Sequence, residues 1–132
     1  PEYVEPGGWG MYPYLTGSAS WYLLTMLTEV FGIKGRLGDL ALEPKLVAQQ
    51  FDAGGSASVL TQFAGRKLRV RYHNPGHLTW GAYTIAGIRL DGEPLACERQ
   101  GQAAPLPRST LAALAAERVH TLDIFLTASA EQ

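Results

Sequence analysis

The hydrophobic period of this chain changes once, at Gly32, and that change limits the folds open to it. Residues 18–31 place apolar side chains three and four positions apart and on most of the remaining circumference, which is typical of a helix buried on several sides. From residue 34 onward apolar and polar residues alternate with a period of two, as in strands with one buried face. The sequence therefore predicts one helix followed by a β domain.

The predicted helix has recognisable ends. Thr16 or Ser18 supplies a hydroxyl that can cap the first free amides, and Gly32 is a typical C-cap residue followed by the apolar Ile33. A helix that is apolar nearly all round cannot stand alone in water. We expect it to belong to a larger helical assembly or to pack on the following domain.

The second part of the chain predicts short strands at residues 40–46, 57–63, 67–73, 88–90, 93–95 and 122–126. Asp91-Gly92 is a strong hairpin signal between two of them. Strands at roughly ten-residue spacing, separated by Gly, Pro and Asn, indicate an antiparallel sandwich or jelly roll rather than a parallel sheet. Residues 110–117, after Ser109 as a possible cap, predict a short helix.

Composition excludes several classes of partner. The chain has 132 residues, 11 Lys plus Arg against 12 Asp plus Glu, and no basic tract, which argues against nonspecific nucleic-acid binding and polybasic membrane attachment. A lone Cys97 cannot form an internal disulfide and no secretion signal opens the chain, so we expect a reducing cytoplasm. Because the chain opens on Pro1 in a loop-like segment, we expect it to be cut from a longer protein.

The β domain offers little chemistry in its sequence. Its carboxylates lie in turns or on the polar sides of strands, where each is expected to be a solvated surface group or a turn residue. His73, His77 and His120 are too scattered to predict a metal site, and Cys97 has no evident base nearby. No nucleophile elbow or phosphate-binding Walker loop is present. We expect the β domain by itself to be inert.

The start of the predicted helix differs from the rest. Thr16 and Gly17 place a hydroxyl and an unhindered amide at its first turn, where free N–H groups and the helix dipole favour an anion such as phosphate. On spacing alone, simple capping by Thr16 or Ser18 is the commoner role. Trp9 and Tyr14 are candidates to line a substrate, although packing is the commoner role for such aromatic residues.

Three segments carry a resemblance to a known family. They are GWGMYPYLTGSASW at 8–21, EVFGI at 29–33 and LALEPKL at 40–46. They resemble the C-terminal end of the glycoside hydrolase family 94 disaccharide phosphorylases, which include cellobiose, chitobiose and cellobionic acid phosphorylases and the phosphorylase-like region of NdvB-type cyclic β-1,2-glucan synthases. The first forty-odd residues carry this resemblance. Their sequence looks closer to the cellobionic acid phosphorylases than to the cellobiose or chitobiose enzymes. Beyond residue 50 only the strand pattern agrees.

The resemblance implies a domain organisation and an activity. Residues 1–33 would be the end of an (α/α)6 barrel, with its last helix, and residues 34–132 a C-terminal jelly-roll β-sandwich. Thr16 and Gly17 match the pair that contacts phosphate in the family. Family members are inverting enzymes, in which a barrel aspartic acid protonates the glycosidic oxygen while phosphate attacks the anomeric carbon and yields a sugar 1-phosphate.

The same resemblance implies what this chain lacks. The general acid would lie upstream in the barrel. That barrel and the N-terminal sandwich before it are missing, so the fragment would be inactive alone. The complete enzyme would be a cytoplasmic homodimer that acts on a β-linked glucosyl disaccharide or β-glucan, with phosphate as substrate and no cofactor or metal.

Two alternatives stay open at this point. One is a region of a cyclic β-1,2-glucan synthase. The other is a noncatalytic carbohydrate-binding β-sandwich with Trp80, Tyr83 and Tyr72 as an aromatic face. Against the second, Tyr72 falls on the apolar alternation with Leu68 and Val70, which predicts a core position.

Overall fold

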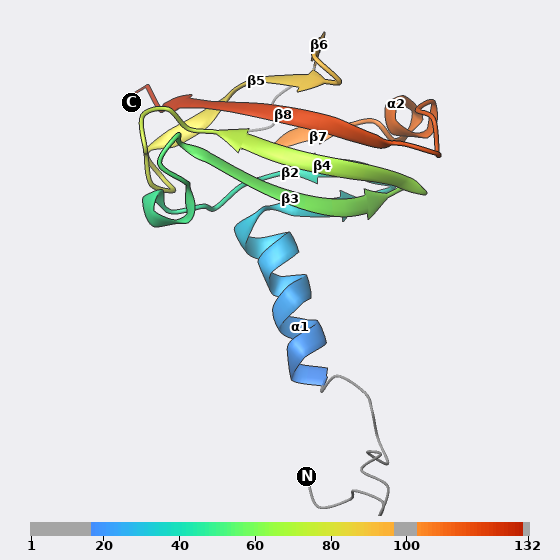
Figure 1. Ribbon diagram of the computed structural model, residues 1–132, viewed down its shortest axis with the longest axis horizontal. Coiled ribbons are helices and arrows are strands. Elements are labelled where there is room, and N and C mark those ends of the chain that lie inside the picture. Colours follow the sequence, from blue (N-terminus) through green and yellow to red (C-terminus); the bar gives the residue numbers. More distant parts are fainter. Residues whose placement is uncertain (1–16, 97–102, 131–132) are drawn as a thin grey trace, which may run out of the picture.

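Two β-sheets make up most of the chain in the computed structural model, which describes residues 17–96 and 103–130 (Figure 1). The helical elements are α1 (Gly17–Thr25), the π-helical η1 (Met26–Val30), the 3-10 helix η2 (Ala48–Gln50) and α2 (Arg108–Ala112). The strands are β1 (Ile33–Arg36), β2 (Asp39–Leu42), β3 (Ser56–Phe63), β4 (Arg66–His73), β5 (Tyr83–Leu90), β6 (Glu93–Leu95), β7 (Ala104–Leu106) and β8 (Val119–Ala128). The fold is mainly β, as expected.

The strands form a three-stranded sheet in the order β1-β2-β7 and a five-stranded sheet in the order β3-β4-β8-β5-β6. One hydrophobic core joins the two sheets, with Leu40, Leu42 and Leu106 from the first meeting the buried side chains of the second. Alternation decides which side chains enter it: Leu68 and Val70 of β4 are fully buried, while Arg69 between them is exposed. The prediction of two sheets packed as a sandwich is confirmed.

The expectation of purely antiparallel pairing is wrong at one place. β4 and β8 are parallel, in register from Lys67 opposite Val119 to His73 opposite Phe125. The long connection between them contains β5, β6, β7 and α2, so the chain has room to return in the same direction. Parallel neighbours need a connection of this kind, whereas the sequence shows only that both segments are strands.

The hairpin at Asp91-Gly92 is confirmed. Leu90 of β5 pairs with Glu93 of β6, and the two residues between them have φ of 50° and 89°. Positive φ at both central positions is the signature of a type I′ turn, whose twist matches that of the flanking strands.

Two predicted elements are shorter than expected. The strand predicted at 40–46 ends at Leu42, because Pro44 lacks a donor for a ladder; its carbonyl accepts instead from the hydroxyl of Tyr83. The helix predicted at 110–117 is α2, whose N-cap is Pro107 rather than Ser109. It begins earlier because the backbone amide of Arg108 donates to Oδ1 of Asp39, a partner remote in sequence.

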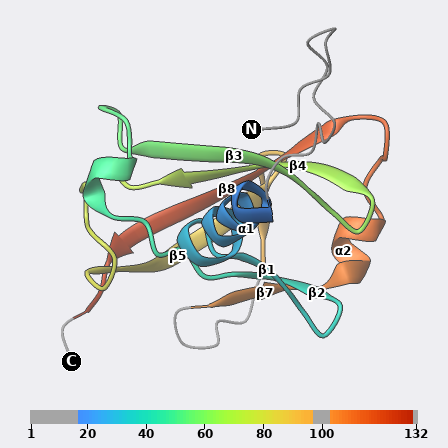
Figure 2. The same cartoon turned by 90° about the horizontal axis from the view of Figure 1, so that it is seen from below.

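The first helix leaves the sandwich instead of packing along it. In Figure 1 α1 points away from both sheets, and Figure 2 looks along its axis from below. Of the described side chains of this helical segment, Leu27, Val30 and Phe31 at the C-terminal end pack against the core. The expectation that the helix ends at Gly32 is confirmed, with φ of 67° there and β1 beginning at Ile33.

Candidate functional site

The structure covers one of the predicted site residues. Gly17 lies in α1 and is the first residue that the structure describes. Thr16, Trp9 and Tyr14 lie outside the described residues. The geometry of a phosphate on Thr16 therefore stays a prediction.

The surface of α1 is apolar and open. Its exposed large side chains are Trp21 (69%), Tyr22 (65%), Leu23 (63%) and Leu24 (49%). The expectation that this helix is buried on several sides is therefore wrong within the described chain, where nothing covers its outer turns. The apolar circumference is as predicted, but burial depends on a partner surface, and within the described chain the sandwich supplies one at the last turn.

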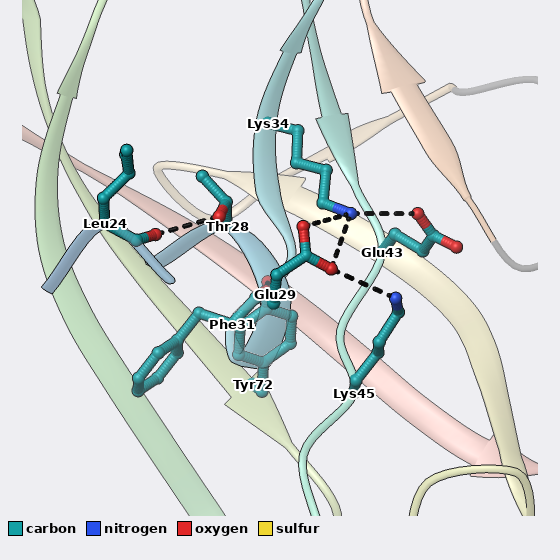
Figure 3. A network of polar contacts seen from close by, with 8 residues as sticks. All are labelled: Leu24, Thr28, Glu29, Phe31, Lys34, Glu43, Lys45 and Tyr72. Atoms are coloured by element: carbon teal, nitrogen blue, oxygen red, sulfur yellow. Dashed lines mark hydrogen bonds and ion pairs between the residues drawn. The ribbon is translucent and has the colours of Figure 1, made fainter. Parts of the chain in front are cut away.

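A polar network ties the end of the helix to the sandwich (Figure 3). The carboxylate of Glu29 lies 3.2 Å from Nζ of Lys34 and 3.3 Å from Nζ of Lys45. Hydrogen bonds from these two ammonium groups, with their charge, lower the pKa of Glu29. Lys34 also faces Glu43 at 3.8 Å. These exposed pairs define an orientation more than they add stability.

Buried contacts at the same junction are stronger. The hydroxyl of Tyr72 donates to the backbone carbonyl of Phe31, and its burial raises the pKa of that hydroxyl well above the usual value. The amide of Glu43 donates to the carbonyl of Gly32 at 2.8 Å, and that of Lys45 to the carbonyl of Val30 at 2.9 Å. Among the residues that the structure describes, the contacts between helix and sandwich thus lie at the C-terminal end of the helix.

A second cluster lies on the outer face of the five-stranded sheet. Nε of Arg71 and Nε2 of His73 lie 2.6 Å and 2.7 Å from the same oxygen, Oδ1 of Asp123. Burial alone would raise the pKa of Asp123, but hydrogen bonds and charge from Arg71 and His73 outweigh it and lower that pKa. His73 stacks on Phe125 with ring centroids 4.8 Å apart.

The third cluster fastens the β5–β6 turn. Oδ2 of Asp91 lies 2.6 Å from Nδ1 of His120 and 2.9 Å from a guanidinium nitrogen of Arg118, and its Oδ1 accepts from the amide of Thr121. The other ring nitrogen of His120 faces the carbonyl of Ala115 at 2.8 Å. The buried ring is therefore held between the carboxylate of Asp91 and the carbonyl of Ala115.

The expectation that every carboxylate is a solvated group is therefore wrong for Asp123, which is only 9% exposed. Asp91 is a turn residue, as expected, but its carboxylate also has fixed partners. The sequence signal for Asp123 was its place between the buried Leu122 and Ile124, on the polar side of a strand. Its partners became visible only with the register of β4 against β8.

Both carboxyls make stability depend on acid pH. The pKa of Asp91 is lowered because hydrogen bonds from His120 and Thr121 and the nearby charges outweigh burial, and the pKa of Asp123 is lowered as described. An unfolded Asp has a pKa of about 3.9. The unfolded state binds more protons, so this stabilisation is complete above about pH 4 and is lost as pH falls through the folded-state values. We expect the free energy of unfolding, from urea titrations, to fall as the pH is lowered below about 4.

The contribution of the Asp123 carboxylate to stability can be tested with a single substitution. Asp123→Asn should be less stable at pH 7 by about 1–3 kcal/mol, because Arg71 and His73 lose their charged acceptor, and should lose less stability on acidification. Glu117→Gln, at an exposed position, is the control. An acid slope equal to that of the parent in Asp123→Asn would contradict the role of this carboxyl.

Two pockets of the described chain lie beside the β1–β2 turn. One of about 180 Å³ lies over the β1–β2 turn and β7, lined by Arg36, Asp39 and Pro105 among others, and a second of about 290 Å³ lies beside Phe63 and Arg108. Within residues 17–96 and 103–130, no three His, Cys, Asp or Glu side chains lie close enough to share a metal ion. No described helix has the length and apolar character needed to cross a membrane.

The aromatic face of the carbohydrate-binding alternative is not formed. Tyr72 is fully buried, as expected, and Tyr83 is 4% exposed with its hydroxyl on the carbonyls of Pro44 and Leu46. Trp80 is exposed, with Nζ of Lys45 6.0 Å from its ring centroid. One open ring remains, next to the anchored end of the helix.

Comparison with protein-family models finds no match, and comparison with curated proteins finds none either.

Proposed function

We propose that this chain is the C-terminal part of an inverting β-glycoside phosphorylase of glycoside hydrolase family 94. In it, α1 is the last helix of an (α/α)6 barrel and the two sheets are the jelly roll that follows. The complete protein cleaves a β-linked glucosyl disaccharide, of the cellobionic acid or cellobiose type, with phosphate to give glucose 1-phosphate. It works as a cytoplasmic homodimer.

The observation that supports this proposal most is the exposed apolar helix. A helix with Trp21, Tyr22, Leu23 and Leu24 open to water is anchored to the sandwich only at its other end. Such a surface is typical of a contact with another part of a protein. A helical barrel upstream would bury it and would line the N-terminal end at Gly17.

The chemistry proposed for this end follows from its backbone. Free amides at a helix start favour an oxyanion, and glycine lets it approach closely. Phosphate bound by Thr16 and Gly17 would be positioned for in-line attack on the anomeric carbon while a barrel acid protonates the leaving oxygen. This chain contributes the phosphate contact, and the acid lies upstream.

The test uses the complete protein that carries this sequence, with Thr16→Val. We expect the KM for phosphate to rise and phosphorolysis of cellobionic acid or cellobiose to fall, by about 10- to 100-fold in kcat/KM for phosphate. The reason is the loss of a charge-assisted hydrogen bond of about 1.5–3 kcal/mol. Thr28→Val is the matched control, because the Thr28 hydroxyl donates to the carbonyl of Leu24 within the helix.

Three outcomes separate the possibilities. Unchanged phosphate kinetics in Thr16→Val would remove Thr16 from the site. Equal effects of Thr16→Val and Thr28→Val would indicate damage to the helix rather than to phosphate binding. Phosphate-dependent trimming of β-1,2-glucan, with no activity on either disaccharide, would favour the glucan-synthase alternative.

A further inference from the structure

The outer face of the five-stranded sheet carries a concentration of positive charge. The exposed side chains of Lys67, Arg69 and Arg71 alternate along β4 with its buried residues, and Arg89 of β5 is exposed on the same face. The register places Arg71, Asp123 and Arg89 side by side across β4, β8 and β5. We call Lys67, Arg69, Arg71 and Arg89 the cationic face.

The charge of this face is not balanced by its neighbours. Among the described residues of β4, β8 and β5 that point to this face, Asp123 is the one acidic residue, and that carboxylate is already bonded to Arg71 and His73. Among the described residues Lys67, Arg69 and Arg89 have no ion pair, and Arg89 lies over the ring of Phe125 with its guanidinium carbon 5.3 Å from the centroid. The four cations and one carboxylate leave a surplus of three positive charges, on a chain whose formal net charge is −1.

The spacing of the cations on this face indicates what kind of ligand it fits. Outward residues of one strand repeat every two positions, about 6.7 Å, so Lys67 and Arg71 are about 13 Å apart, and β5 lies about 10 Å from β4 across β8. Alternate residues of an extended peptide have the same spacing. Such a face matches a short segment with carboxylates at alternate positions, whereas it is too small to follow a nucleic-acid strand through many phosphates.

The face also contains an example of the contact that it would make. Nε of Arg71 donates to Oδ1 of Asp123 at 2.6 Å, so one of these four cations already holds a carboxylate. Arginine clusters recognise acidic motifs in proteins through such pairs. We infer that the cationic face is a docking surface for an extended acidic peptide segment of a partner protein. This inference does not depend on the proposed phosphorylase function.

The experiment measures fluorescence anisotropy of a labelled peptide of alternating Glu and Thr on the 132-residue chain at low salt. We expect saturable binding that weakens as salt is raised through the physiological range, because the pairs are exposed to solvent. The double variant Arg69→Glu/Arg89→Glu should bind about tenfold or more weakly, since two attractions become repulsions. Lys67→Glu alone should show a smaller loss. The control is Arg36→Glu, the same change on the other sheet.

The comparison probes are an oligo-dT strand of equal charge and a peptide whose glutamates are replaced by glutamines. Binding of the Glu/Thr peptide that is lost in the double variant but kept in Arg36→Glu supports the inference. Three results would overturn it: no saturable binding, equal losses in both variants, or tighter binding of oligo-dT than of the peptide. Circular dichroism checks that each variant retains the β spectrum.

Discussion

Gly32→Ala is expected to destabilise the fold by about 4 kcal/mol or more, the largest effect that we predict for a single substitution. Gly32 has a φ of 67°, and a Cβ built there would lie 1.9 Å from the backbone carbonyl oxygen of Glu43 and 2.6 Å from the backbone nitrogen of Pro44. Both obstacles are backbone, so no side chain can rotate away. Relief would require the helix to move and break the bond from the amide of Glu43 to the carbonyl of Gly32.

Gly65→Ala is the matched control. Gly65 has a φ of 72°, close to that of Gly32, but a Cβ there would meet nothing within 4 Å. It should therefore show only the cost of a left-handed backbone, about 1–2 kcal/mol. Urea titrations at pH 7 measure both variants. If the two alanines destabilise equally, close backbone contact is not what Gly32 provides.

His120→Ala is expected to lower the free energy of unfolding by about 3 kcal/mol, the second large effect that we predict. The ring is 1% exposed, and its loss would remove partners from both Asp91 and the carbonyl of Ala115 and leave a cavity. Arg118→Ala is the matched control, because its guanidinium binds the same Asp91 oxygen at 2.9 Å but its side chain is 65% exposed. That change should lower the free energy of unfolding by less than about 1 kcal/mol.

Urea titrations of the two variants separate burial from charge. A large loss of stability in His120→Ala with a small one in Arg118→Ala would support the buried imidazole as the group that joins the β5–β6 turn, the start of β8 and the segment after α2. Similar small losses would mean that water replaces the imidazole without cost.

Some properties of the first helix could be predicted from the sequence and others could not. Its apolar period and its end at Gly32 were predictable, because spacing and a C-cap are local properties. Its exposure was not predictable, since burial depends on which surface meets it. Its orientation is set by hydrogen bonds from Tyr72 to Phe31 and from Glu43 to Gly32. These bonds join segments that are distant in the sequence, and no local pattern predicts that they meet.

The candidate sites divide in the same way. The helix that contains Gly17 was predictable from its apolar period, whereas the phosphate proposed at its start rests on Thr16, outside the described residues. The cluster at Asp123 was missed, because its partners Arg71 and His73 lie 52 and 50 positions away along the chain. The polar side of β4 was visible as an alternation, but its neighbours across the sheet were not.

The change from helix to strand, the apolar side of each strand and the Asp91-Gly92 turn can be read from the residues alone, because they depend on side-chain period and on the backbone preferences of single residues. The parallel pairing of β4 and β8, the position of Arg89 beside the cations of β4 and the outward direction of α1 follow from the three-dimensional packing. Those features come from the register of distant segments, and register is chosen by packing energy summed over the whole core rather than by any local pattern.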